Sequence, residues 1–223
     1  MTVENDTSYL EGRKELCNEY GVNFDEVKAI HLKLVPLIKN IVEKEKIAKK
    51  LNESYENVDR NLKYWKEIWD LSTSNVTPKQ KSLLELFLYL ELSEGVFDEL
   101  VQVIAYILME NHHDLYDPHH LKFLKDQKEL DKLDFYFKLQ FLEKHDFEFV
   151  VKAFDRDLRN AIAHLDFLIK EDGNIVSRKS GQKIGNVTDK NNYLGTLCAM
   201  IIVIINKVLI GDPAIIIEHK KKC

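Results

Sequence analysis

Residues 154–166 read FDRDLRNAIAHLD, and this stretch decides how the whole chain is interpreted. At about 100° per residue, a helical wheel places the apolar side chains of this region on one face. These side chains are Val150, Val151, Phe154, Leu158, Ala161 and Ile162. Arg156, Asn160 and His164 form an i, i+4, i+8 stripe on the opposite face. Arg159 flanks that stripe at roughly 140° from His164, so we expect its flexible side chain to bend toward the histidine.

The residue types in the stripe suit the cleavage of RNA. A histidine titrates near neutral pH and can move a proton. An arginine carries a planar positive fork that suits a phosphate and the extra charge of its transition state. RNA supplies its own nucleophile, the 2′-hydroxyl group, so one base and one cation suffice without a metal ion. The candidate catalytic residues are therefore Arg159 and His164, with Asn160 positioning them, and Arg156 is a candidate RNA contact.

The segment from Arg159 to His164, RNAIAH, resembles the R-x(4–6)-H signature of the HEPN family, the higher-eukaryote and prokaryote nucleotide-binding domain. The surroundings of the motif fit the same family. It lies on a late helix of a predicted helical bundle, before a hairpin-like insert and one more apolar helix. The resemblance covers roughly residues 78–211, and residues 1–75 show no comparable motif.

The resemblance implies a helical bundle that forms a homodimer, with two copies of the motif facing each other. It also implies a metal-independent endoribonuclease of toxin–antitoxin or antiviral defence systems, with RNA as substrate and an antitoxin or nucleotidyltransferase as partner. Arg159 and His164 would form the catalytic centre, and Asn160 would support it. The alternative is a non-catalytic HEPN module that binds a nucleotide or a partner protein. In toxins controlled by nucleotidyltransferases, a tyrosine follows two residues after the histidine; here Asp166 stands there, either orienting the imidazole or beginning the next strand.

Charge restricts where RNA can bind. The chain has a formal net charge of -5 and a pI of about 5.9, so RNA binding requires a local basic patch. Arg178, Lys179 and Lys183 form the best local candidate for RNA binding, provided that a predicted hairpin folds beside His164. The Asp-Gly pair at 172–173 predicts a type I′ turn between strands 166–169 and 175–178.

Composition favours an all-α protein. Eight glycines and four prolines among 223 residues are too few for a turn-rich β-sandwich, because average usage of the two together is roughly 12%. We expect a helical N-terminal region over residues 1–75, a HEPN-like helical domain with the β-hairpin insert over 76–211, and a tail over 212–223. The expected helices span 7–20, 24–41 with a kink or break at Pro36, 55–71, 79–110 with an optional break at 93–95, 121–145 with an optional break near Lys128, 147–164 and 188–210. Gly21 is expected to end the first of these in a left-handed cap. Thr77 as N-cap and Pro78 at the first position are expected to begin the helix that runs to 110, and Thr188 or Asp189 is expected to cap the last helix.

The remaining features of the sequence do not point to a further catalytic site. Three distant cysteines exclude a disulfide framework or a structural zinc site, and no cofactor is expected. The histidine-rich loop 111–120 is interpreted as a polar surface loop, with metal binding as the alternative. Glu91, Glu94, Asp98 and Glu99 are assigned to a solvated helix face. The charge-rich stretch 43–50 is assigned to another solvated face, with an RNA-binding patch as the alternative. The longest apolar run, at 197–205, is short of the ~20 residues of a membrane span, so we expect a cytoplasmic protein.

Overall fold

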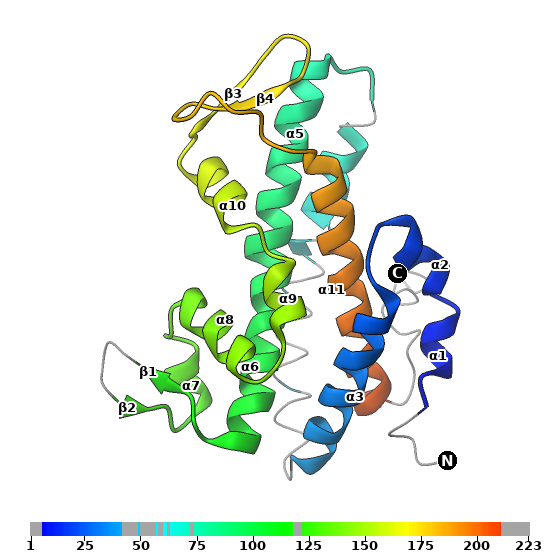
Figure 1. The fold of residues 1–223 in the computed structure, drawn as a ribbon, viewed down its shortest axis with the longest axis vertical. Coiled ribbons are helices and arrows are strands. Elements are labelled where there is room, and N and C mark those ends of the chain that lie inside the picture. Colours follow the sequence, from blue (N-terminus) through cyan, green and yellow to red (C-terminus); the bar gives the residue numbers. More distant parts are fainter. Residues whose placement is uncertain are drawn as a thin grey trace.

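The computed structural model describes residues 6–41, 49, 57, 60–61, 63–71, 74–117 and 122–210. Most of them are helical, which confirms the all-α class. The expected charged stretch 43–50 (apart from Lys49) and the tail 212–223 lie outside the described residues. Of the expected helix 55–71, the described residues 57, 60–61 and 63–71 are helical. Figure 1 shows an elongated arrangement in which the long helices run roughly along one direction.

The N-terminal part begins with three helices: α1 (Ser8–Glu11), α2 (Lys14–Glu19) and α3 (Phe24–Asn40). The single helix predicted for residues 7–20 is wrong, because the chain breaks between α1 and α2. Gly21 follows α2 with φ +72°, a conformation that glycine adopts without strain. The side chain of Asn23 accepts the N–H of Asp25 and begins α3, which runs through Pro36 without a break.

The longest helical unit joins α5 (Pro78–Glu91), a π-helical segment η2 (Leu92–Phe97) and α6 (Asp98–His112). Its start matches the prediction: Thr77 and Gln80 form a reciprocal capping box, and Pro78 occupies the first turn. The expected irregularity at 93–95 is the wider π turn, and the helix continues through it. Figure 1 shows this unit extending along most of the molecule.

The region before the motif is more broken than predicted. The observed helices are α7 (Gln127–Leu130), α8 (Phe135–Lys144), α9 (Glu148–Lys152) and α10 (Arg156–Ala163). The predicted helix 147–164 is therefore wrong, because the chain leaves helical geometry at 153–155 and restarts with Asp155 as N-cap. Arg156 is consequently the first residue of a short helix and not a mid-helix position.

Two small antiparallel hairpins complete the fold. The first pairs β1 (Tyr116–Asp117), inside the predicted loop 111–120, with β2 (Lys122–Phe123). The predicted helix 121–145 is therefore wrong at its start, where the chain forms β2 before α7. The second pairs β3 (Phe167–Ile169) with β4 (Ile175–Ser177), so the predicted hairpin exists. Its predicted type I′ turn is wrong: Gly173 has φ +84°, but Asp172 is not among the described residues with positive φ. The Gly173 N–H donates to the Lys170 oxygen, as in a three-residue loop with glycine at the left-handed position.

The last helix, α11 (Val187–Ile210), is the centre of the core and packs on α3, α5 and η2. Asn186, not Thr188 or Asp189, caps it by accepting the N–H groups of both residues. The helix segment Val187–Leu209 is long and apolar enough to cross a membrane, but 61% of its apolar 18-residue stretch is buried inside the protein. Such burial is typical of a core helix in a soluble protein.

The N-terminal helices and the motif-bearing part share one hydrophobic core. Leu34 and Ile38 of α3 belong to the same buried cluster as Ile201 and Ile204 of α11. Asn61 also approaches η2 closely, because a Cβ on Gly95 would lie 2.3 Å from its Nδ2 atom. The boundary predicted near residue 75 therefore divides elements that pack together; whether the two parts are separate domains stays a prediction.

Candidate functional site

Helix α10 is anchored at its N-terminus by Asp155. One Asp155 carboxylate oxygen accepts the N–H of Leu158, and the other pairs with Lys190 of α11. Burial alone would raise the pKa of this carboxyl, but the bonds from Lys190 and Leu158 outweigh it and hold the pKa below its ordinary value. The Asp155 N–H also donates to the buried Tyr89 hydroxyl of α5 at 2.9 Å. Two other elements thus fix where the motif helix begins.

Arg159 forms no hydrogen bond with His164 among the described residues. Its Nη1 donates to Oδ1 of Asn160 at 3.1 Å, and its Nη2 lies 2.5 Å from Oε1 of Glu94 in η2. The expectation that Arg159 bends to the histidine is therefore wrong for the single chain. Its contact with Asn160 agrees with the positioning role expected for the asparagine.

His164 is the C-cap of α10 and its side chain is exposed. The backbone N–H of His164 donates to the backbone oxygen of Asn160, so the two residues keep the one-turn spacing expected on a shared face. Within the described part of the chain, the imidazole has no hydrogen-bond or ion-pair partner. Both ring nitrogens are therefore free to meet a substrate or a second chain.

The chain reverses directly after His164 through a Schellman motif. The Asp166 N–H donates to the Ala161 oxygen at 2.7 Å, and the Leu165 N–H donates to the Ile162 oxygen at 3.0 Å. Leu165 takes the left-handed position with φ +54°, where glycine is usual. A non-glycine residue costs about 1–2 kcal/mol there, and strain of this kind is common at functional sites.

The reversal brings the β3–β4 hairpin back beside the motif, as expected. Lys179 pairs with the Asp166 carboxylate, and the Arg178 N–H donates to the Asp166 oxygen. Asp166 thus holds the basic turn, and no contact between its carboxylate and His164 is found in the described residues. The Arg178 side chain donates through Nε to the Phe167 oxygen, whereas Lys183 is exposed and forms a backbone bridge to Val176.

Arg156 is separated from the other motif residues by a contact of its own. Its guanidinium lies 4.6 Å from the ring centroid of Tyr136 on α8, as in a cation–π contact. The stripe of Arg156, Asn160 and His164 is thus only partly assembled: Asn160 and His164 share one turn, and Arg156 is held against α8.

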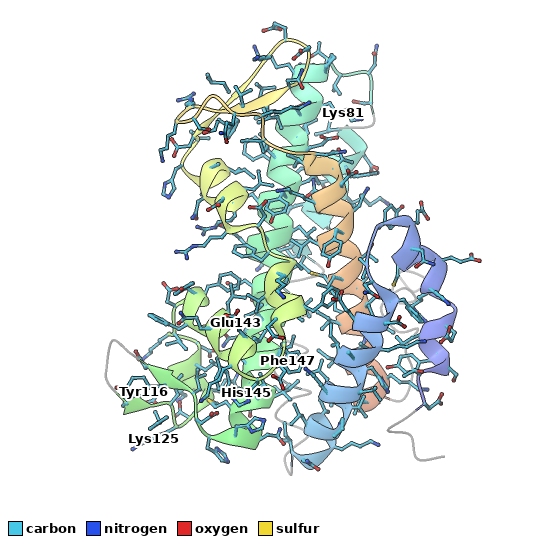
Figure 2. The ribbon with its side chains drawn as sticks, in the orientation of Figure 1. Lys81, Tyr116, Lys125, Glu143, His145 and Phe147 are labelled. Atoms are coloured by element: carbon cyan, nitrogen blue, oxygen red, sulfur yellow. The ribbon has the colours of Figure 1, made fainter. Side chains whose placement is uncertain are left out.

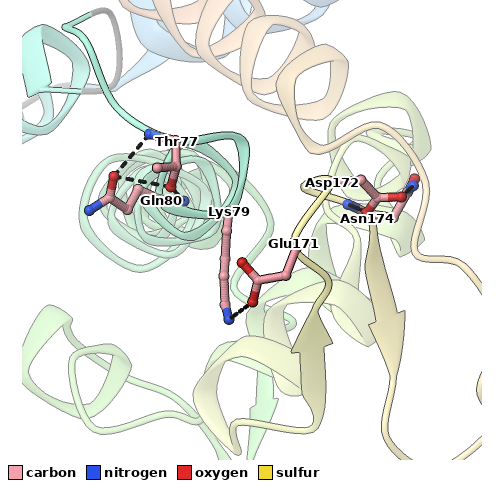
Figure 3. Close-up of polar contacts among 6 residues, drawn as sticks. All are labelled: Thr77, Lys79, Gln80, Glu171, Asp172 and Asn174. Atoms are coloured by element: carbon pink, nitrogen blue, oxygen red, sulfur yellow. Dashed lines mark hydrogen bonds and ion pairs between the residues drawn. The ribbon is translucent and has the colours of Figure 1, made fainter.

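The tip of the hairpin is docked on the first turn of α5, as Figure 3 shows. Lys79 lies 2.6 Å from the Glu171 carboxylate, and the Ser82 hydroxyl donates to the Gly173 oxygen at 2.7 Å. The Asp172 side chain accepts from the backbone and side chain of Asn174, which orders the turn. These contacts fix the hairpin and, through it, the basic residues near His164.

The four carboxylates assigned to a solvated face have different surroundings. Glu94 binds Arg159, and Glu99 accepts a hydrogen bond from Asn57 at 3.0 Å. Burial raises the pKa of the Asp98 carboxyl, and its Oδ1 atom is buried with no hydrogen-bond partner in the described residues. Burial also raises the pKa of Glu91, with the Glu94 charge adding to the effect. The solvated-face interpretation is therefore wrong for Asp98, whereas Glu94 is exposed as expected and also pairs with Arg159.

A small polar cavity of about 190 Å³ lies beside this row of carboxylates. Its lining residues are Asp98, Glu99, Gln102, Asp131 and Lys138. Gln102 donates to Asp131 at 2.5 Å, while its own Oε1 accepts nothing from the described residues. No group of three or more histidine, cysteine, aspartate or glutamate side chains in the described residues has a geometry that could hold a metal ion.

The histidine-rich segment lies away from the motif. His112 stacks on His145 with ring centroids 4.2 Å apart, and Asp114 accepts from His145 Nε2 at 3.1 Å. Figure 2 shows His145 toward one end of the molecule and Lys81 of α5 toward the other. Within the described residues this segment forms an aromatic and ion-pair cluster; His119 and His120 lie outside them.

No protein-family model matches the chain, and comparisons with curated proteins and with solved structures find no significant match. The resemblance to the HEPN family therefore stays a prediction from the motif.

Proposed function

We propose that the protein is a metal-independent endoribonuclease of the HEPN type that acts as a homodimer, serving as a toxin or defence effector. The observation that carries this proposal is the exposed imidazole of His164, which has no partner among the described residues and lies one helical turn from the Asn160 that holds Arg159. A general base must be accessible to its substrate, and a phosphate needs a positioned cation nearby.

The proposed reaction uses the 2′-hydroxyl of RNA. The imidazole of His164 takes the 2′-hydroxyl proton as the O2′–P bond forms, and the P–O5′ bond breaks. A protonated His164 from a second copy of the chain gives a proton to the leaving 5′ oxygen. Arg159 stabilises the charge that develops on the phosphate. The products are a 2′,3′-cyclic phosphate and a 5′-hydroxyl end.

A second copy is needed because one chain does not bring its arginine and histidine together. Arg159 is bound to Glu94 and Asn160, whereas His164 lies exposed at the helix end. A two-fold axis near α10 would set the arginine of each chain against the histidine of the other. Leu165 and Leu168, which are 58% and 50% exposed, are apolar residues beside the motif that such an interface would cover.

The basic turn is the proposed contact for the RNA backbone. Arg178 and Lys179 are held close to His164 through Asp166, and Lys183 is exposed on the same hairpin. Phosphate contacts of this kind supply affinity that falls as salt rises. Arg156 adds a further positive charge at the start of α10.

The proposal is tested by measuring the rate at which wild type, Arg159→Ala and His164→Ala cleave a generic RNA in the presence of EDTA. Loss of the general base is expected to lower the rate by about 10²–10⁴, and loss of the arginine by about 10²–10³. His113→Asn is a matched control, because it removes an exposed imidazole at a left-handed position that asparagine tolerates. Equal cleavage by wild type and both site variants would refute the proposal.

One observation favours the alternative, a non-catalytic HEPN module. The charge of Arg159 is already paired with Glu94 in the single chain. A protein that only binds a nucleotide or a partner would show saturable RNA or nucleotide binding without any cleavage in the same assay.

A further inference from the structure

We propose that Glu94 is the positioning residue for Arg159: it orients the guanidinium toward the scissile phosphate and does not compete with the RNA for it. This inference rests on the proposed function. It assigns a role to a residue that lies 65 positions before Arg159 and outside the R-x(4–6)-H motif.

The first support is the number of donors on the arginine. A guanidinium has five N–H donors. The contacts with Asn160 Oδ1 and Glu94 Oε1 engage one Nη atom each, at 3.1 Å and 2.5 Å. At least three N–H groups therefore have no partner among the described residues and stay available to a phosphate, while the side chain is held from two sides.

The second support is the rigidity of the segment that carries Glu94. Its neighbours in η2 are buried, and the Ser93 hydroxyl donates to the Leu90 oxygen at 3.0 Å. A π turn inserts an extra residue into a helix and is frequent at functional sites. The η2 segment projects one half-exposed carboxylate from a fixed backbone, with 45% of the Glu94 side chain exposed.

The third support is that η2 and the motif helix are packed together. Phe97 of η2 stacks on Phe154, just before α10, with ring centroids 5.7 Å apart. Leu158 and Ile162 of α10 are also buried in the core. The distance between the backbones of Glu94 and Arg159 is therefore set by packing, and the ion pair orients a side chain between two fixed elements.

A guanidinium held in this orientation is expected to stabilise the transition state of cleavage more than it strengthens the binding of RNA. Because at least three N–H groups of the arginine have no partner among the described residues, the Glu94 contact is expected to change ground-state binding of RNA little. Orientation of the remaining N–H groups acts at the reacting phosphate, where misplacement by 1 Å can cost about 10²-fold in rate. Loss of Glu94 is thus expected to lower kcat much more than it changes KM.

Single-turnover and steady-state cleavage by Glu94→Ala and Glu94→Gln tests the inference. Glu94→Ala is expected to lose about 10–100-fold in kcat, with KM little changed. Glu94→Gln keeps an acceptor oxygen for Nη2 and is expected to stay within about 3-fold of wild type. Glu11→Ala is the matched control, since it removes a carboxylate from a partly exposed ion pair with Lys28 at 3.0 Å.

Two kinetic results would overturn the inference. A Glu94→Ala protein that cleaves as fast as wild type, or faster, would show that the carboxylate competes with the RNA. A Glu94→Gln protein as slow as Glu94→Ala would show that its charge, and not its contact geometry, is what matters.

Guanidinium ¹⁵N NMR separates this inference from the proposed function and does not require activity. Rotation of the Arg159 side chain about Nε–Cζ is expected to be slow in wild type and fast in Glu94→Ala, with the signal assigned by its loss in Arg159→Lys. Slow rotation in a wild type that cleaves no RNA would refute the nuclease and the proposed role in cleavage, leaving only the ion pair. Fast rotation in wild type would refute the positioning role whether or not RNA is cleaved.

Discussion

Replacing Gly173 with alanine is expected to destabilise the docked hairpin that carries the basic turn. Gly173 has φ +84°, and an alanine Cβ would lie 3.0 Å from the Pro78 carbonyl oxygen and 3.1 Å from Ser82 Oγ. The left-handed conformation costs a non-glycine residue about 1–2 kcal/mol. Overpacking against backbone that cannot move costs a further 1–3 kcal/mol or so, so the total is roughly 2–5 kcal/mol.

Two glycines of the same protein serve as controls. Gly181 has φ +67° and nothing within 4 Å of the position that an alanine Cβ would take, so Gly181→Ala carries only the conformational cost. Gly12 has φ -62° and also has free space around it, so Gly12→Ala is expected to leave stability unchanged or slightly higher.

Thermal unfolding followed by circular dichroism measures the series. One kcal/mol corresponds to about 2–4 °C in Tm for a chain of this size. Gly173→Ala is therefore expected to lower Tm by roughly 4–20 °C, Gly181→Ala by roughly 2–8 °C, and Gly12→Ala not at all. Equal losses for Gly173→Ala and Gly181→Ala would show that the hairpin tip does not press on α5, and the docking in Figure 3 would be refuted.

Three further predictions concern stability and assembly. Burial raises the pKa of Asp98, so its charge opposes folding above pH 3.8; Asp98→Asn is expected to raise stability by about 1 kcal/mol at pH 7, and this gain shrinks as pH falls toward 3.8. A gain that is constant with pH, measured by urea unfolding, would contradict this. Leu165→Gly is expected to raise the free energy of unfolding by about 1 kcal/mol, because glycine adopts the left-handed conformation without strain, and an unchanged Tm would argue against strain. Wild type is expected to sediment as a dimer and Leu168→Glu as a monomer, and a monomeric wild type would refute the proposed assembly.

Local signals in the sequence predict several elements correctly. Thr77 and Pro78 are neighbours in the chain and predict an N-cap followed by proline, so the start of α5 is confirmed. The same holds for the left-handed Gly21 and for the existence of the β3–β4 hairpin. In each case the atoms that form the contacts are within a few residues of one another.

The errors arise where distant residues decide the structure. The apolar period continues from Val150 to Ile162, yet the helix breaks at Asp155, because its N–H binds Tyr89 and its carboxylate binds Lys190. The reversal after His164 carries no glycine signal, since Leu165 takes the left-handed position under tertiary constraint. Neither the helix break at Asp155 nor the left-handed conformation of Leu165 can be inferred from the periodicity of the motif.

The candidate site shows the same division. The motif singles out Arg159, Asn160 and His164 as candidates. In the structure, the Arg159 side chain donates a hydrogen bond to the Asn160 side chain, and His164 is exposed. The sequence alone places Glu94 on a solvated face, because carboxylates on a helix usually lie in water. Its partner is 65 residues away in the chain, so only the folded structure brings the two side chains together.

The central claim, that His164 activates the 2′-hydroxyl of RNA, is tested most directly by the ends of the cleavage products. An oligoribonucleotide is incubated in EDTA with wild type or His164→Ala, alongside the same strand carrying one 2′-deoxy residue at the cleaved position. The account predicts 2′,3′-cyclic phosphate and 5′-hydroxyl ends from wild type alone, and no cleavage at the deoxy position. Cleavage that continues at the deoxy position, leaves 5′-phosphate ends or persists in His164→Ala would contradict it.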